Sequence, residues 1–284
     1  MIKKIAHILK GREKQITREE SVLQPLPHAD FRFANPFIVL HHQLPKKIEP
    51  GSSARIHPHP HRGFAPVTIM LQGEGLHQDN AGHREIVKAG DVQWMFAGKG
   101  LLHSEGPSDE VLKNGGVQEF IQLWINVPKR HKLEEPSYQT AAAVDQPKVL
   151  QQEGTDFRLA SGNYDSATGP LSSFTPVIIV SGSIKKNKRV QFSATAGYWT
   201  LLYVVKGKLC INQETIEEHH LVVFEKENDE IFACAEEETE VIFLSAEPIE
   251  EPVAAKDNFV MNTMEEIDQA LRDYNNGLFG NLNY

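Results

Sequence analysis

The stretch from residue 57 to residue 105 decides the fold. It begins HPHPHRGF (57–64) and ends GKGLLHSE (98–105). Between these ends lie the apolar run VTIML (67–71) and the run GDVQWM (90–95), each next to glycine-marked turns. Short apolar runs separated by turn residues are typical of a β-sandwich or barrel. Six of the chain's thirteen histidines lie in this stretch, so the predicted barrel carries a histidine cluster.

The spacing of these histidines predicts a metal site. Residues i and i+2 of a β-strand point to the same face. His59 and His61 therefore project together, and so do His103 and Glu105. Two such strands side by side offer three imidazoles and one carboxylate to a single point. This mixed set suits a first-row divalent metal with open coordination positions, at ligand distances of ~2.0–2.2 Å by analogy with zinc sites.

A plainer interpretation treats residues 57–61 as a short histidine tract that binds metal weakly and without function. A single histidine is also more often a surface or hydrogen-bonded residue than a ligand. Two separate i, i+2 sets beside glycine turns favour a true site. Spacing alone leaves the ligand set open, because His57 shares the face of His59 and His61.

Composition narrows the class of protein. A chain of 284 residues with 40% hydrophobic residues is long enough for one large or two ordinary globular domains. The formal net charge of −9 argues against direct binding to nucleic acid. Cys210 and Cys234 are too few for a disulfide framework, so we expect buried thiols in a reducing compartment.

The chain carries no membrane signal that can be read from its sequence. Residues 1–10 have the charges of a signal peptide but no sufficient apolar core. No stretch approaches the ~20 apolar residues of a membrane span. We therefore expect a cytoplasmic protein that does not contact a membrane.

The pattern predicts two β-rich domains. Residues 1–130 form the first, including an N-terminal arm; residues 131–156 form a charged, proline-bearing linker; and residues 157–284 form the second. The runs TLLYVVKGK (200–208) and VTIMLQGE (67–74) have the same shape, an apolar strand that ends in a polar-glycine-polar turn. This similarity suggests a duplicated domain.

The second domain is predicted to lack metal ligands. Aligning Gly207 on Gly73 places Ser193 and Thr195 where the first copy has its leading histidine pair. His219 and His220 are adjacent, so in a strand they would face opposite sides and could not chelate together. We expect a structural or surface role for them.

Residues 264–275 are predicted to form a helix near the C-terminus. Thr263 and Glu266 have the spacing of a capping box. An apolar stripe follows at helical spacing, and Asn276-Gly277 ends the helix. The stripe consists of Ile267, Ala270, Leu271 and Tyr274. Packing against a β-domain is the favoured role for it, and binding of a partner is the alternative.

The order of the motifs resembles that of the pirins, a family of the cupin superfamily. The resemblance spans most of residues 33–280. It implies an all-β bicupin, with two double-stranded β-helix (jelly-roll) barrels and a short C-terminal helix. The matching motifs are HPHRGF (59–64), GDVQWM (90–95) with AGKG (97–100) and HSE (103–105), QLWINVP (122–128), EPSYQ (135–139) and FVMNT (259–263) with the terminal helix and Phe279-Gly280.

The resemblance implies one divalent transition metal in the N-terminal barrel. Carried over by position, its ligands are His59, His61, His103 and Glu105. Fe(II) is the metal we expect, with Mn, Ni, Co, Cu and Zn as alternatives, because ligand type rarely selects among them. His57 then lies just outside the cavity or competes as an alternative ligand.

Other residues near these motifs are candidates to support the site. Asp79, Gln93 and Trp94 are candidates to orient the imidazoles through their free ring nitrogens. Trp94 has the stronger alternative of a core residue, and Phe64 either lines the pocket or fills the barrel. The chain departs from the family at Ala65, where a glutamate is usual, and at LHHQ (40–43), where LDHF is usual. These departures bear on substrate preference more than on metal binding.

Bacterial pirins resemble quercetin 2,3-dioxygenases, which implies an oxygenase acting on a flavonol or similar aromatic enol with dioxygen. Four protein ligands leave about two adjacent positions on an octahedral metal for these molecules. Glu105 then has two roles, metal ligand and base for the acidic hydroxyl proton. The metal lowers the pKa of that hydroxyl as it does for bound water.

A competing interpretation is a metal- or redox-sensing regulator that binds a protein partner without turnover. The family resemblance implies transcription cofactors of this type, and the acidic charge favours a protein partner over nucleic acid. A third interpretation is a barrel that binds metal without chemistry. A solvent-open cavity beside the metal, large enough for an aromatic ligand, favours the enzyme. The resemblance also leans towards a monomer.

Overall fold

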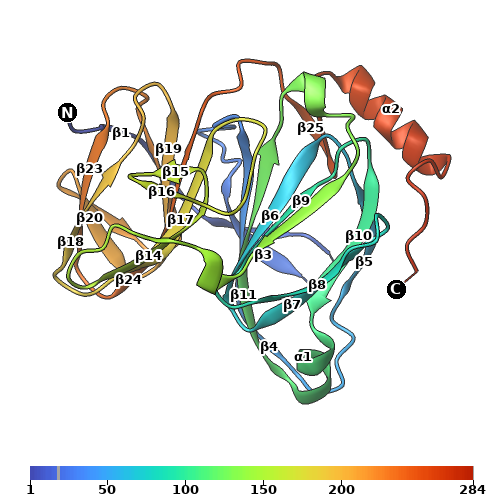
Figure 1. Cartoon of the computed structure of the whole chain (residues 1–284), viewed down its shortest axis with the longest axis horizontal. Coiled ribbons are helices and arrows are strands. Elements are labelled where there is room, and N and C mark those ends of the chain that lie inside the picture. Colours follow the sequence, from blue (N-terminus) through green and yellow to red (C-terminus); the bar gives the residue numbers. More distant parts are fainter. Residues whose placement is uncertain (18–19, 284) are drawn as a thin grey trace. The chain divides into compact units, whose positions relative to one another are not determined.

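Strands make up most of the chain in this computed structural model, which describes residues 1–17 and 20–283 (Figure 1). Two α-helices accompany them in the described ranges, α1 (Asp109–Asn114) and α2 (Met264–Asn275). Neither is long and apolar enough to cross a membrane. The predicted all-β class is confirmed. Contacts divide the chain into two units: barrel 1 contains residues 39–143 and 249–283, and barrel 2 contains residues 1–38 and 144–248.

The two ends of the chain join the barrels in a way that differs from the predicted domain boundaries. The sequence placed the N-terminal arm with the first domain and the C-terminal helix with the second. In the structure residues 1–38 belong to barrel 2 and residues 249–283 to barrel 1. Strand β1 (Ile5–Lys10) pairs with β22 (His220–Phe224), more than two hundred residues later. Local patterns cannot reveal such pairing, because either barrel offers a similar edge.

Barrel 1 consists of two antiparallel sheets. One sheet contributes the neighbouring strands β12-β9-β6-β11-β4, which are part of a seven-stranded order, and the other has the order β5-β10-β7-β8. Part of the predicted linker is therefore strand, since β12 pairs with β9. The strands are β4 (Phe37–Ile48), β5 (Ile56–His61), β6 (Phe64–Gln72), β7 (Glu74–Asp79), β8 (Arg84–Lys88), β9 (Val92–Phe96), β10 (Leu101–Pro107), β11 (Gly116–Asn126) and β12 (Ser137–Ala141).

A tight glycine turn connects the two sheets of barrel 1. Gly73 lies between β6 and β7 with φ +76°, and a Cβ on it would lie 2.1 Å from the carbonyl oxygen of Val117. Only glycine fits there without displacing β11. Gly207 has the same role in barrel 2. Its φ is +87°, and a Cβ on it would lie 2.4 Å from the carbonyl oxygen of Glu238. The matched turns support the predicted duplication.

Helix α2 packs onto barrel 1 beside the short strands β25 (Ala254–Lys256) and β26 (Phe259–Met261). Its capping box is present, because the Thr263 hydroxyl accepts from the Glu266 N–H and the Glu266 carboxylate accepts from the Thr263 N–H. Ile267 and Ala270 are buried in a cluster with Phe259 and Phe279. The predicted helix and its packing role are confirmed.

Barrel 2 also consists of two antiparallel sheets, in the orders β1-β22-β19-β24-β17-β14-β13 and β18-β23-β20-β21. In the rest of the N-terminal segment, β2 (Arg12–Gln15) pairs antiparallel with β3 (Ser21–Leu26). The other strands are β13 (Lys148–Val149), β14 (Thr155–Ser161), β15 (Asn163–Tyr164), β16 (Ala167–Thr168), β17 (Val177–Ile184), β18 (Arg189–Ser193), β19 (Trp199–Lys206), β20 (Lys208–Ile211), β21 (Glu214–Glu217), β23 (Glu230–Ala235) and β24 (Thr239–Ala246).

Apolar side chains fill the interior of barrel 2. Phe157, Phe192 and Phe243 are buried there, and the rings of Phe192 and Phe243 stack with their centroids 5.0 Å apart. Ser193 and Thr195 are exposed. Among the described residues, the group of three or more potential metal ligands lies in barrel 1.

Candidate metal centre

Three histidines meet inside barrel 1. His59 and His61 lie on β5, and His103 lies on β10 directly opposite His59. One potential ligand atom from each ring lies within 4.8 Å of the other two. The ring centroids of His59 and His103 are 4.2 Å apart, and those of His61 and His103 are 4.8 Å apart. The i, i+2 spacing and the strand pairing thus bring these three imidazoles to one point.

Backbone carbonyls orient two of the three rings. Nδ1 of His59 lies 2.9 Å from the carbonyl oxygen of His57, and Nδ1 of His61 lies 3.2 Å from that of Asn258. Because a carbonyl only accepts, each Nδ1 carries the hydrogen, and each Nε2 keeps a free lone pair for a metal. His57 therefore supports the site through its backbone, while its own ring lies in an exposed position.

His103 shows that the site suits a metal ion. It is only 1% exposed, and neither ring nitrogen has a hydrogen-bond partner among the residues that the structure describes. A buried polar atom left unpaired is costly, so a ligand for this ring is expected. Burial and the neighbouring histidines lower the pKa of His61 and His103 well below the usual value. Both rings are thus neutral at pH 7, the form that binds metals.

Glu105 does not join the group formed by the three histidines. The pairing of β10 with β5 shifts between His103 and Glu105, so Glu105 lies opposite Ile56. Its carboxylate accepts hydrogen bonds from Nε2 of Gln122 on β11, at 3.0 Å to one oxygen and 3.2 Å to the other. The i, i+2 rule assumes an unbroken ladder, and this bulge is what spacing alone could not predict.

A second polar layer is centred on His77, which the sequence reasoning missed. Its Nδ1 accepts from Nε2 of Gln93 at 3.1 Å, and its Nε2 donates to Asp79 at 3.2 Å. The His77 ring lies 5.4 Å from that of His103, centroid to centroid. Asp79 and Gln93 thus hold His77 and not the three clustered rings. The i, i+2 spacing of His77 and Asp79 was the available signal.

A partly exposed wall borders the cluster. The Phe64 ring on β6 packs edge-on against the His61 ring, with the centroids 5.2 Å apart. The Trp124 ring on β11 does the same, with the centroids 5.7 Å apart. His41 on β4 lies 6.4 Å from Trp124. His41, Trp124 and Glu105 are half-buried, so solvent reaches this side of the site. Trp94, by contrast, is a buried core residue.

The side chains of Lys132 and Arg62 form hydrogen bonds at the end of β5, the strand that carries His61. Nζ of buried Lys132 donates to the carbonyls of Gly63 at 2.7 Å and Val260 at 2.9 Å, and to Oδ1 of Asn126 at 2.5 Å. Arg62 donates to Asp273 of α2 at 2.6 Å. Burial lowers the pKa of Lys132 to about 7, so the ammonium, which alone can donate to all three acceptors, gives way to the neutral amine above that pH.

Comparison with known proteins matches both barrels to one family. Residues 16–125 match the profile described as Pirin, and residues 179–280 match the one described as Pirin C-terminal cupin domain. The chain belongs to the pirin family. The predicted family and the bicupin architecture are confirmed.

Several relatives of this pirin carry the name of an enzyme. A Pseudomonas aeruginosa protein named "Putative quercetin 2,3-dioxygenase" is 34% identical over 247 residues, 86% of each chain. A crystal structure of quercetin 2,3-dioxygenase from Acinetobacter baumannii is 33% identical, with a TM-score of 0.92 and 99% of both chains covered. A bacterial pirin from Escherichia coli in complex with nickel(II) shares the fold at 22% identity, with a TM-score of 0.65, covering 86% of this chain and 99% of that one.

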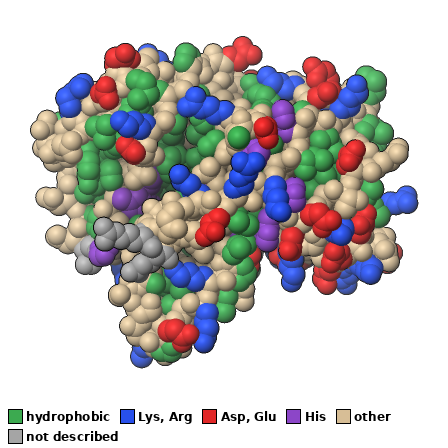
Figure 2. Space-filling model, turned by 180° about the vertical axis from the view of Figure 1, so that it is seen from behind, with side chains coloured by type: hydrophobic (Ala, Val, Ile, Leu, Met, Phe, Trp, Pro, Cys, Tyr) green, Lys and Arg blue, Asp and Glu red, His purple; other side chains and the backbone are tan. Residues whose placement is uncertain are grey.

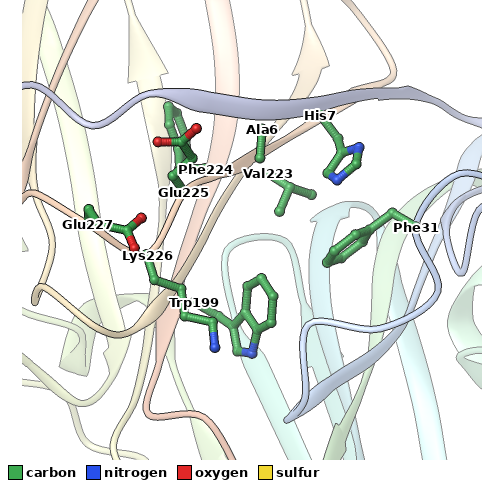
Figure 3. A pocket seen from close by; sticks show the side chains of 9 residues that line it. All are labelled: Ala6, His7, Phe31, Trp199, Val223, Phe224, Glu225, Lys226 and Glu227. Atoms are coloured by element: carbon green, nitrogen blue, oxygen red, sulfur yellow. The ribbon is translucent and has the colours of Figure 1, made fainter.

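Barrel 2 of this pirin has a surface hollow of its own, of about 370 Å³. Aromatic rings form much of its wall, and the Lys226 ammonium lies 4.5 Å from the centroid of the Trp199 ring (Figure 3). Its lining offers one imidazole and no second one. The hollow is lined by Ala6, His7, Phe31, Trp199, Val223, Phe224, Glu225, Lys226 and Glu227. The histidine cluster of barrel 1 therefore remains the candidate metal centre.

Charged side chains of both signs are mixed on one face of the molecule. Lysine and arginine side chains are interspersed with aspartate and glutamate on the face seen in Figure 2. Binding to the phosphate backbone needs a basic stripe or patch.

Proposed function

We propose that this pirin is a metal-dependent dioxygenase acting on quercetin or a similar flavonol or aromatic enol. The observation that carries the proposal is the His103 ring, buried without a hydrogen-bond partner among the described residues and 4.2 Å from that of His59. Three imidazoles that can each offer a nitrogen to a metal lie beside the half-buried ring of Trp124, an aromatic surface of the kind that a planar substrate contacts. The names of the relatives supply the substrate class.

The metal ligands in this proposal are the three clustered histidines, His59, His61 and His103, with Glu105 as the fourth, although its carboxylate lies outside their group and accepts from Gln122. Fe(II) is the favoured ion, with Mn, Ni, Co, Cu and Zn as alternatives. When bound, the ion supplies Lewis acidity towards the substrate hydroxyl and a site for chemistry with dioxygen. His59 and His61 present Nε2 because the carbonyls of His57 and Asn258 hold their Nδ1 hydrogens.

Glu105 is the base for the substrate hydroxyl proton. It lies on the solvent-reachable side, and a base must come within ~2.6–3.2 Å of the proton donor. Gln122 holds both carboxylate oxygens and so fixes the direction in which the carboxylate faces. The ring of Trp124 offers a surface on which a flavonol can stack.

Oxygen uptake on adding quercetin tests this function. The protein is reconstituted anaerobically with Fe(II), and its bound iron is measured before each assay. We expect uptake by the wild type and by His57→Ala, whose carbonyl is retained, and none by His59→Ala or His103→Ala. We expect Glu105→Gln to keep some metal and lose turnover, and full activity of that variant removes the role of base from Glu105.

If protein that holds its iron tightly takes up no oxygen, the proposed dioxygenase activity is rejected. The alternative of a regulator that binds a protein partner is then favoured. We also propose that the protein acts in the cytoplasm as a monomer. The chain has only two cysteines, too few for a disulfide framework, which supports a reducing compartment. Fractionation and light scattering test these two points.

A further inference from the structure

The only two cysteines of the chain lie directly opposite each other in barrel 2. Cys210 is on β20 and Cys234 is on β23, which are neighbours in the sheet β18-β23-β20-β21. Arg189 lies beside Cys234 on β18, and Thr215 lies beside Cys210 on β21. The four side chains therefore form one row across the sheet.

Both thiols lie on the outer face of this sheet. Leu209 and Ile211 flank Cys210, Ala233 and Ala235 flank Cys234, and all four flanking residues are buried in the core of the barrel. Side chains alternate along a strand, so the two cysteines point away from the core. Both are half-buried free thiols. The expectation of fully buried thiols was wrong, because an apolar run also contains the residues of its outer face.

The backbone geometry of the pair allows a disulfide. The N–H of Glu236 donates to the Lys208 carbonyl at 2.9 Å, which marks a hydrogen-bonded position. Hydrogen-bonded and non-bonded positions alternate, so the cysteine pair two residues along is of the same kind, with a typical Cα separation of about 5.5 Å. Disulfides span Cα separations of about 4.4–6.8 Å.

The Cβ atoms set how stable such a bond is. Directly opposite residues have Cβ atoms about 4.5–5.5 Å apart, with hydrogen-bonded pairs towards the wider end, whereas a disulfide prefers about 3.5–4.5 Å. The two strands must therefore draw together slightly for the bond to form. A strained bond on an accessible face is reduced more readily than a relaxed, buried one.

We propose that Cys210 and Cys234 form a reversible site of oxidation by hydroperoxides. The sulfur of one thiolate attacks a peroxide oxygen, the O–O bond breaks, and the leaving oxygen takes a proton to become water or an alcohol. The resulting sulfenic acid is attacked by the second thiolate, the S–O bond breaks, and hydroxide leaves and is protonated to water. Two thiols are oxidised to one disulfide as one peroxide is reduced, and a dithiol reductant restores them.

The test exposes reduced, full-length protein to a small excess of hydrogen peroxide and then measures thiols and intact mass. We expect the thiol count to fall from two per chain to none, with a loss of two hydrogens in mass and a peptide that links Cys210 to Cys234. Dithiothreitol should restore both thiols. Retention of both thiols, or oxygen added to each cysteine independently, overturns the proposal.

A matched control moves one thiol along the same row. Exchanging the side chains of residues 210 and 215 (Cys210→Thr with Thr215→Cys) keeps two thiols on the same face. It separates them by two strand spacings of about 4.8 Å each. This variant and Cys210→Ser should gain oxygen as sulfenic acid and form no intramolecular bond. A bond at equal rate in the exchanged variant, or a bond only between chains, also overturns the proposal.

Discussion

Replacing Lys132 by methionine should destabilise barrel 1 strongly. The Nζ atom donates to three oxygens, those of Gly63, Asn126 and Val260, at 2.5–2.9 Å, and the side chain is buried. Methionine fills a similar volume but donates nothing. Each of the three buried acceptors left unpaired costs about 1–3 kcal/mol, and removal of the desolvated ammonium offsets part of that cost. We expect a loss of about 3–5 kcal/mol in the free energy of unfolding.

The assay is urea unfolding of the wild type, Lys132→Met and a matched control, Lys47→Met. Lys47 is exposed and pairs with Glu49 at the surface, so its replacement should cost no more than about 1 kcal/mol. A loss for Lys132→Met no larger than that of the control refutes the reasoning.

The pH dependence gives a second check on Lys132. Burial lowers its pKa in the folded state to about 7, below the ordinary 10.5. Between these values the unfolded state binds more protons, so stability rises with pH across this window. The difference in unfolding free energy between wild type and Lys132→Met should therefore widen from pH 7 to pH 9. A difference that narrows contradicts the sign.

Three further predictions concern the polar groups around the histidine cluster. Fe(II) at about 100 times its Kd should raise the unfolding free energy of the wild type by about 2.7 kcal/mol, and that of His103→Ala by far less, as measured by anaerobic chemical unfolding. Gln122→Leu should keep bound iron but lower kcat for quercetin about tenfold, which corresponds to about 1.4 kcal/mol, because Glu105 loses the donor that orients it. An unchanged kcat would exclude this orienting role of Gln122. His77→Phe should lower stability by about 3 kcal/mol because Gln93 and Asp79 each lose a buried partner, and a change below 1 kcal/mol in urea unfolding would count against the second polar layer.

The sequence predicted the histidine cluster because its signal is local. His59 and His61 have fixed spacing within one strand, and a β-barrel readily places the strand of His103 beside theirs. The helix at 264–275 was equally predictable, because capping and an apolar stripe are short-range features. The helix and the spacing of His59 and His61 depend on interactions within a few residues, whereas the position of His103 beside them also needs the pairing of β10 with β5.

What the sequence could not predict depends on long-range pairing. The partner of His61 is the carbonyl of Asn258, 197 residues away, supplied by a C-terminal segment that sequence reasoning assigned to the other domain. The bulge between His103 and Glu105 arises from the pairing of β10 with β5, and no residue pattern predicts this bulge. The opposition of Cys210 and Cys234 is likewise a matter of strand register.

The most direct test of the metal centre is the iron content of protein reconstituted anaerobically with Fe(II) and freed of unbound metal. The geometry predicts one ion per chain in the wild type and in His57→Ala, and almost none in His59→Ala, His61→Ala or His103→Ala. Full iron content in any of these last three variants, or its loss in His57→Ala alone, would contradict the assignment of the three clustered histidines as the metal ligands.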